Sequence, residues 1–205
     1  MTTITSTRQM ERLDEAGRAM LFTQARTANT FDSTPVTDDE LAGIWDLAQW
    51  PPTAANFQPL RVVYVRTPEG KARLLPHLAD GNKDKTASAP AVAILARDTR
   101  FHEHIPTVFP ARAQMREAFE DDAAGRDQVS TFNSALQVGY FLLAVRAQGL
   151  AAGPMGGFDR ETLDREFFAD GRLASVLVVN IGHPGTDPWF DRLPRLEHED
   201  VVQYL

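Results

Sequence analysis

The clearest absence in this chain of 205 residues is cysteine, which does not occur at all. Without cysteine the protein can have no disulfide, no thiolate nucleophile, no iron–sulfur cluster and no cysteine-ligated zinc. Long apolar runs are missing too: no window approaches the roughly 18 to 20 apolar residues of a membrane-crossing helix. The opening residues MTTITSTRQMERLDEAG also lack the apolar core of a signal peptide. We therefore expect a cytoplasmic protein with no membrane partner.

Positive charge is scarce, because 21 basic residues face 28 acidic ones and give a formal net charge of -7. That sign is wrong for a dedicated nucleic-acid surface, so we expect no nucleic-acid partner. Any bound anion would instead need a local group of cationic side chains. Common short motifs are absent as well, including the phosphate-binding G-x-x-x-x-G-K-[ST] and the zinc-binding H-E-x-x-H. His102 and His104 stand at strand spacing, but no motif places a third ligand beside them, and we expect no metal site.

What the chain does contain is 43% hydrophobic residues, enough for a substantial core. With no repeat and no long linker, residues 1–205 are expected to form a single domain. Apolar residues at helical spacing predict a helix over residues 8–25. Thr37 and Glu40 have the spacing of a capping box, which predicts a second helix over 38–49 that ends before Pro51.

Three continuous apolar runs, 62–65, 91–96 and 175–181, predict strands covered on both faces. Short helices are expected after Thr67, through about residue 75, and after Asp159, through about residue 168. The longest periodic segment, 128–148, ends at Gly149 and is apolar nearly all round in its second half. It should lie in the core or in a subunit interface. Prolines then make the last twenty residues an extended arm with a possible final turn at 199–204.

Four polar segments stand where predicted elements end. In the first, 25–31, Arg26 offers a planar fork of donors beside Thr27 and Asn29, which suits a phosphate monoester. The alternative is an arginine that complements the dipole at a helix end, with Asn29 as a cap. The second segment, 51–61, could lie against a flat ligand or could simply connect a helix to a strand.

The third segment precedes the second predicted strand, and the fourth follows the longest predicted helix. Segment 81–86 holds Asn82 and Lys85, and the alternative interpretation of this segment is a solvated turn. Segment 149–159 is rich in glycine, so its backbone N–H groups could approach a ligand, although a plain turn needs glycines too.

Taken in order, these segments resemble the FMN-dependent nitroreductases, and within them the malonic semialdehyde reductases of the pyrimidine-degradation (Rut) pathway. The resemblance covers essentially the whole chain and is carried by LFTQARTAN at 21–29, WPPTAAN at 50–56, RTPEGK at 66–71, GLAAGPMGGFD at 149–159 and RLPRL at 192–196. It implies an α+β nitroreductase-like fold: a central, mostly antiparallel sheet flanked by helices, a long core or interface helix, and an extended C-terminal arm. It also implies a homodimer with FMN bound between the two subunits.

The same resemblance implies the cofactor-binding residues. The phosphate and ribityl end of FMN would be held by residues of the first segment and the arm: Arg26, Thr27, Asn29, Arg192 and Arg195. The partner chain would supply Thr53, Ala54 and Asn56, and the pyrimidine edge of the flavin would meet Asn82 and Lys85. The ring would be lined by Pro154, Met155, Gly156 and Gly157, with a backbone N–H near Gly156 directed toward flavin N5.

This sequence departs from many nitroreductases at two positions. Asn29 replaces a second cation in the first motif, and Gly156 replaces a frequent acidic residue. Both departures resemble the semialdehyde reductase branch. For the substrate carboxylate, the only suggestions are Arg61 or an arginine within 97–116.

A borrowed cofactor fits a chain that has no side-chain nucleophile of its own, because the flavin supplies the reactive atom. The expected reaction is ping-pong: NADH or NADPH gives a hydride to flavin N5, and a small aldehyde such as malonic semialdehyde is then reduced to 3-hydroxypropionate. No side chain is expected to be catalytic. The alternatives are a broad nitroaromatic or quinone reductase, a flavin-binding or small-molecule-binding protein without turnover, and a purely structural interaction protein.

Overall fold

The chain is built on a four-stranded sheet, shown in a computed structural model that describes residues 11–205. The strand order is β1-β2-β4-β3, and every neighbouring pair is antiparallel. The expected α+β fold, with an antiparallel sheet flanked by helices, is therefore confirmed. The strands are β1 (Leu60–Val65), β2 (Ala91–Asp98), β3 (Ala151–Met155) and β4 (Leu173–Gly182).

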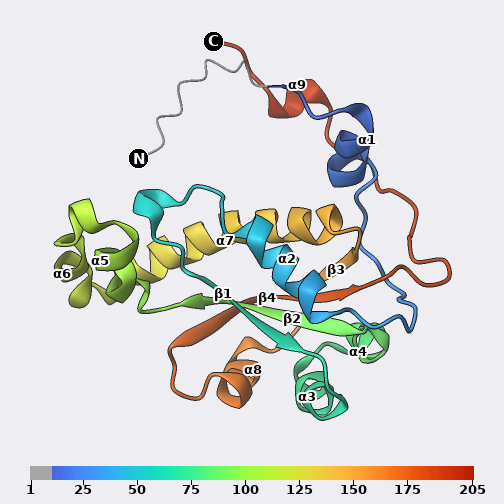
Figure 1. Cartoon of the computed structure of the whole chain (residues 1–205), viewed down its shortest axis with the longest axis horizontal. Helices are drawn as coiled ribbons and strands as arrows, with labels where there is room; N and C mark the ends of the chain where they lie inside the picture. Colours follow the sequence, from blue (N-terminus) through green and yellow to red (C-terminus); the bar gives the residue numbers. More distant parts are fainter. Residues whose placement is uncertain (1–10) are drawn as a thin grey trace.

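Helices connect and cover these strands (Figure 1). The α-helices are α1 (Glu15–Arg18), α2 (Asp38–Ala48), α3 (Pro68–Leu74), α4 (Asp80–Ser88), α5 (Ile105–Val108), α6 (Met115–Glu120), α7 (Ala123–Ala147), α8 (Arg160–Phe167) and α9 (His198–Val201). A π-helical turn, η1 (Ala19–Thr23), extends α1, and the 3₁₀ turns are η2 (Ala54–Asn56), η3 (Leu75–His77), η4 (Phe101–His104) and η5 (Pro110–Arg112).

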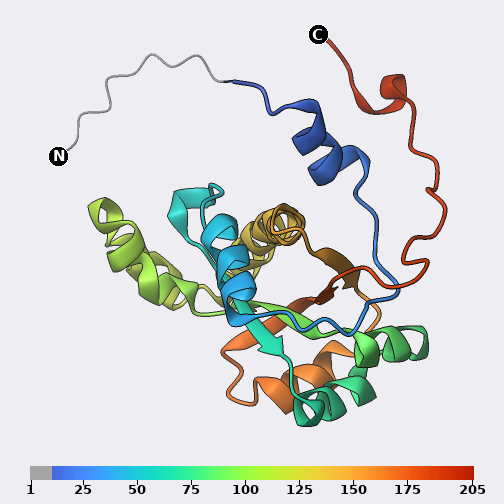
Figure 2. The same cartoon turned by 45° about the vertical axis from the view of Figure 1, so that its right-hand side comes forward.

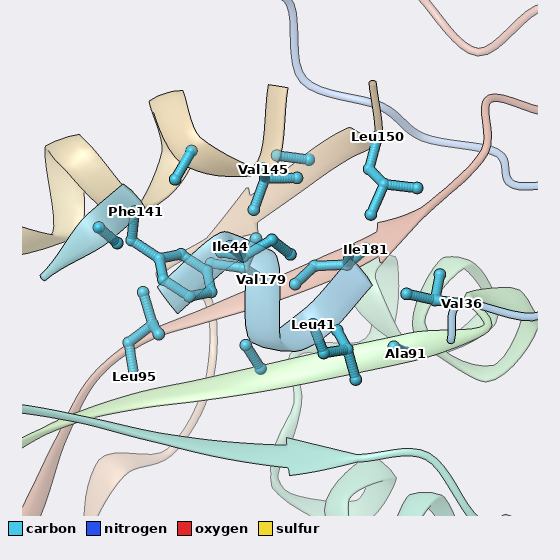
Figure 3. Packing of buried hydrophobic residues seen from close by; sticks show 14 of the residues in the cluster. Val36, Leu41, Ile44, Ala91, Leu95, Phe141, Val145, Leu150, Val179 and Ile181 are labelled. Carbon is cyan, nitrogen blue, oxygen red and sulfur yellow. The ribbon is translucent and has the colours of Figure 1, made fainter. Parts of the chain in front are cut away.

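The sheet is the middle of three layers, with α2 and α7 on one face and α3, α4 and α8 on the other (Figure 1). Alternate residues of β2 point into the two cores: Leu95 packs with the α2–α7 side, and Ile94 packs with the α3–α8 side. Figure 3 shows the first core, where Ile44 of α2 and Phe141 of α7 meet the sheet residues Val179 and Leu95.

Local capping sets the helix ends where the sequence predicts them. The hydroxyl of Thr37 accepts from the N–H of Glu40 at 3.2 Å, and the N–H of Thr37 donates to the Glu40 carboxylate at 2.7 Å. At the end of α7, Gly149 has a φ of 77°, and the N–H of Leu150 donates to the carbonyl of Val145 at 3.1 Å. This is a Schellman arrangement, which needs a residue without a side chain at the left-handed position.

β1 is an edge strand with four partly exposed residues, yet it packs on both cores as predicted: Val62 lies on the α2–α7 side and Val63 on the α3–α8 side. Two other sequence predictions need correction. Segment 81–86 is part of helix α4 rather than a turn. Strand β3 was not predicted, because glycine and proline within segment 149–159 are more typical of turns than of strands.

Both ends of the described chain lie apart from the three layers (Figures 1 and 2). Helix α1 and η1 bury no residue, although the sequence predicts an amphipathic helix over 8–25, of which residues 8–10 lie outside the described part. The arm after β4 is extended and also exposes its large apolar side chains, which include Phe190, Leu193, Leu196 and Tyr204. Apolar surface left in the open on both ends is typical of a surface that a partner covers.

Candidate functional site

A cavity of about 230 Å³ lies where the first polar segment meets the C-terminal arm. We call it the arginine cavity. Its lining comprises Ala25, Arg26, Thr27, Asn29, Phe190, Asp191, Arg192, Leu193 and Arg195. The structure thus brings together all five residues that were expected to hold a phosphate, although the two from the arm lie more than 150 positions after the three from the first segment.

Hydrogen bonds join the two walls of the arginine cavity. A guanidinium nitrogen of Arg26 donates to the carbonyl of Phe190 at 3.4 Å, and one of Arg192 donates to the carbonyl of Thr23 at 2.7 Å. The backbone N–H of Asn29 donates to the carbonyl of Pro188 at 3.0 Å. The arm is therefore held against residues 23–29 mainly by arginines that bond backbone oxygens.

Charge in the arginine cavity is opposite to that of the protein as a whole. Arg26, Arg192 and Arg195 face a single acidic residue, Asp191, whereas the chain carries a net charge of -7. Arginine forks match the oxygen geometry of phosphate and carboxylate groups. The arrangement suits an anion that carries about two negative charges, as a phosphate monoester does near neutral pH.

The first segment is fixed to the sheet between its polar residues. The N–H of Ala28, a fully buried residue, donates to the carbonyl of Ala152 in β3 at 2.9 Å. Gly153 lies against the same turn, since a Cβ there would come within 2.7 Å of the Ala28 carbonyl oxygen. Thr27 and Asn29 flank this anchor, and the Asn29 amide donates to the Thr27 carbonyl at 3.3 Å.

A second pair of predicted segments also meets in space. The Asn82 amide of α4 donates to the carbonyl of Gly157 at 2.9 Å, and a Cβ on Gly157 would come within 2.8 Å of that amide nitrogen. Lys85 lies one turn further along the same helix, on the side that Asn82 occupies. A Cβ on Gly156 would meet nothing within 4 Å, so the backbone there faces open space.

Residues Thr53, Ala54 and Asn56 lie elsewhere. They precede β1 in the loop 53–58, near α5 and the first half of α7, whereas α4 stands at the opposite end of the sheet (Figure 1). One chain therefore does not bring loop 53–58 to the arginine cavity or to Asn82.

The backbone of loop 53–58 is strained. Ala55, Asn56 and Gln58 have φ values of 46°, 57° and 45°, in the left-handed region that costs an L-residue about 1–2 kcal/mol. Such strain persists where the surroundings overdetermine the conformation, and it is concentrated at functional sites. The Asn56 amide donates to the carbonyl of Val108 at 2.8 Å and accepts from Gln58 at 2.8 Å.

Two buried amides of α7 hold this loop and the start of β1, and the sequence analysis missed both. Asn133 and Gln137 of α7 accept from the N–H groups of Ala54 and Leu60, at 2.7 and 3.0 Å. Phe57 of the same loop is buried in an aromatic cluster with Phe101, at a centroid distance of 5.1 Å. The only sequence signal was a pair of amides four residues apart on a helix that is otherwise largely apolar.

The suggested carboxylate-binding arginines differ in availability. Arg61 pairs with the buried Asp98 at 2.8 Å and also donates to two backbone carbonyls, beside a larger cavity of about 850 Å³. Arg97, Arg100 and Arg116 each pair with a carboxylate. Arg112 is exposed, and no carboxylate of residues 11–205 lies within 4 Å of it. Both arginines that line the larger cavity, Arg61 and Arg172, already pair with carboxylates, so the arginine cavity is the better anion site although it is smaller.

The two histidines differ in exposure, because His102 is buried and His104 is exposed. His102 and His104 lie on the 3₁₀ turn η4 rather than on a strand, and within residues 11–205 no three potential ligands are grouped to hold a metal ion. His102 is buried, with its Nε2 3.4 Å from the Glu120 carboxylate. Burial is the main cause that lowers the pKa of His102, and the positive charge of Arg126 adds to it.

Comparisons with known proteins bear on the family and the fold. The family described as the nitroreductase family matches residues 23–183. Two proteins of Streptomyces coelicolor, both provisionally named NADH dehydrogenase/NAD(P)H nitroreductase, are similar over 190 residues. SCO7141 is 62% identical and SCO5049 is 50% identical; each alignment covers 93% of this chain, and 94% and 96% of the relative.

Among solved structures, a provisionally named nitroreductase from Exiguobacterium sibiricum, crystallised with FMN, has a TM-score of 0.82 at 19% identity. The match covers 97% of this chain and all of the other. At that identity the likeness concerns the fold. In the described part of this chain, no helix is both long enough and apolar enough to cross a membrane.

Proposed function

This chain belongs to the nitroreductase family, and from that premise we propose that it is an FMN-dependent NAD(P)H oxidoreductase whose substrate is malonic semialdehyde. The proposal treats residues 1–205 as one FMN-binding domain. The observation that carries it is the arginine cavity, a local excess of cationic side chains in an acidic protein. The proposed net reaction converts NAD(P)H, a proton and malonic semialdehyde to NAD(P)⁺ and 3-hydroxypropionate.

The residues fit FMN at both of its ends. The phosphate would be held by Arg26, Arg192 and Arg195, with Thr27 and Asn29 beside them. The flavin ring would lie near Asn82 and Lys85 and would be lined by Pro154, Met155, Gly156 and Gly157, with open space at the backbone of Gly156. Bound FMN would supply the hydride chemistry, accepting a hydride from NAD(P)H and giving it to the aldehyde.

The protein's own contribution is binding and orientation. Guanidinium groups neutralise the phosphate, and the Asn82 amide, held by Gly157, keeps α4 beside the ring-lining segment. Preorganised dipoles of this kind contribute to catalysis without a nucleophilic side chain. No catalytic side chain is therefore proposed.

A homodimer is part of the proposal, because Thr53, Ala54 and Asn56 can complete the site only from a second chain. The solvent side of α7 supports this assembly. Phe132, Leu136 and Tyr140 recur at four-residue spacing and are 63%, 40% and 46% exposed. A helix stripe of this kind, together with the uncovered apolar arm, fits an interface between two copies.

For the substrate carboxylate we propose Arg112, which precedes α6 and follows Val108, the residue that holds Asn56. Replacing Arg112 with alanine should lower kcat/KM for malonic semialdehyde about tenfold or more, because a charge-assisted hydrogen bond is lost. The matched control is Arg116→Ala, which removes an exposed arginine already paired with Glu120 at 3.8 Å. Equal effects of the two changes on this substrate would contradict the role of Arg112.

The cofactor is tested by the absorbance spectrum of the purified protein before and after anaerobic mixing with NADH or NADPH. A bound flavin that bleaches supports the oxidoreductase. A flavin that stays oxidised would indicate binding without turnover, and a colourless protein that takes up no added FMN would refute the proposal.

A broad NAD(P)H nitroaromatic or quinone reductase is the second candidate, favoured by the names of the Streptomyces relatives. Steady-state kinetics separate the two candidates. The semialdehyde proposal requires a higher kcat/KM for malonic semialdehyde than for a nitroaromatic, and an equal or reversed preference would favour the second candidate.

A further inference from the structure

Four polar residues form a buried stripe along α7. Ser130, Asn133, Ser134 and Gln137 are each at most 1% exposed, at positions that share one helix face. A buried polar group is costly unless it is hydrogen-bonded. Each such residue therefore needs a structural or functional reason, and the four differ in what they bond.

Asn133 makes a bond that leaves its own helix. Its amide nitrogen donates to the carbonyl of Val129 at 2.9 Å, which orients the side chain so that its oxygen accepts from the N–H of Ala54 at 2.7 Å. Ala54 opens the turn η2, directly before the residues in the left-handed region. The bond therefore holds loop 53–58 at the start of its strained part.

Gln137, one turn later, provides an internal comparison. Its oxygen accepts from the N–H of Leu60 at 3.0 Å, where strand β1 begins. That bond stabilises the sheet edge rather than the loop. Ser134 lies between the two, and its buried hydroxyl has no partner within residues 11–205.

We propose that Asn133 is a positioning residue for the flavin, acting through the Ala54 N–H on the loop that reaches the FMN of the partner subunit. This inference rests on the proposed FMN site between two chains. It gives α7 two roles. One face presents Phe132 and Leu136 to the second copy, and the buried stripe positions the loop that contacts the FMN of that second copy.

The bond can be removed from either side. Asn133→Leu deletes the acceptor with little change in volume. Ala54→Pro deletes the donor, and the backbone accepts it, because the first position of a helical turn tolerates proline and Thr53 already has the extended φ of -123° and ψ of 160°. The controls are Gln137→Leu, which loses the bond to β1, and Ser134→Ala, which loses no bond.

The measurement is FMN release on dilution of the purified holoprotein, followed by recovery of flavin fluorescence, together with the visible spectrum of the bound flavin and thermal unfolding. Asn133→Leu should weaken FMN retention about tenfold and change the flavin spectrum, the consequence of one lost bond to a buried group. Ala54→Pro should act similarly, and the double variant should be no weaker than the stronger single one, because both remove the same bond. Gln137→Leu should lower the unfolding temperature without altering the spectrum, and Ser134→Ala should resemble the wild type.

Several results would overturn the inference. These are unchanged FMN retention in Asn133→Leu, fully additive losses in the double variant, or an equal loss of FMN in Gln137→Leu at equal loss of stability. Should Asn133→Leu fail to fold, Ala54→Pro alone decides, since wild-type retention in that variant is incompatible with the proposal. A wild-type protein that retains no FMN would instead refute the proposed function, and this inference with it.

Discussion

The two ends of the sheet hold their candidate cofactor residues by different physical means. Beside β3, the arginine cavity consists of exposed guanidinium groups that bond the backbone carbonyls of a second chain segment. Before β1, loop 53–58 is held by the buried amide of Asn133 and by Phe57 in an aromatic cluster. One end presents charge on exposed arginine side chains, whereas the other end has a strained backbone conformation.

Because of this difference, substitutions at the two ends should affect ligand affinity and protein stability to different extents. Removing an exposed arginine changes the protein's free energy of unfolding little, because water solvates the groups that the arginine had contacted. A buried aromatic ring or amide cannot be removed without leaving a cavity or an unpaired group. Substitutions in the arginine cavity should therefore reduce ligand binding without loss of stability, whereas substitutions of the buried groups that hold the loop should reduce stability, whether or not FMN retention falls with it.

The largest expected effect is on stability at the loop end. Phe57→Ala should lower the free energy of unfolding by about 3–5 kcal/mol, since it empties a site in the aromatic cluster. Phe57 is 4% exposed, whereas Phe190 in the arm is 74% exposed. Phe190→Ala is therefore the matched control and should change the unfolding midpoint in denaturant little. Similar losses at both positions would remove the contrast between the two ends.

Ligand affinity at the cavity end should be affected next. Arg26→Ala should weaken FMN retention by about 1.5–3 kcal/mol, the range for a hydrogen bond to a charged group, while the unfolding midpoint of the flavin-free protein stays close to wild type. Equilibrium dialysis against FMN measures the first quantity. The control is Arg165→Ala, an exposed arginine paired with Glu161 on α8. Unchanged FMN affinity in Arg26→Ala would refute a phosphate-binding role.

Adding a single methyl group where the first segment meets strand β3 should lower the stability of the protein. Gly153→Ala would place a Cβ 2.7 Å from the Ala28 carbonyl oxygen, a backbone atom that cannot rotate away. Overpacking of this kind costs about 1–3 kcal/mol, measured by denaturant unfolding. Gly156→Ala meets nothing within 4 Å and should be nearly neutral for stability. A neutral Gly153→Ala would mean that the first segment is not fixed against β3.

The smallest expected effect depends on pH at the loop end. The pKa of His102 is lowered by burial and by Arg126, against the opposing charges of Glu120 and Glu103. The unfolded chain therefore takes up a proton near pH 6.5, roughly the ordinary histidine value, that the folded chain resists. Stability should fall as the pH drops below that value, and His102→Phe should flatten the profile in thermal unfolding. A wild-type profile in that variant would exclude His102 as the source.

Much of the local structure could be predicted from the sequence because its causes are local. The Thr37 capping box, the Gly149 terminus and the apolar runs of β2 and β4 depend on residues within a few positions of one another. Strand β3 and helix α4 could not be predicted this way. The glycine and proline of β3 are tolerated because it is paired with β4, and the polar segment of α4 is fixed to the sheet by the buried Thr86, which contacts Met155 of β3.

The candidate site divides in the same way. The sequence by itself predicted the FMN-binding segments, since the residues around Arg26, Thr53, Asn82 and Gly156 carry the family resemblance. Only the tertiary structure decided that Arg192 and Arg195 meet Arg26, that loop 53–58 stands at the opposite end of the sheet, and that Asn133 holds it. The reason is physical: capping and hydrophobic periodicity act over a few residues, whereas a cavity between distant segments depends on how the whole chain packs.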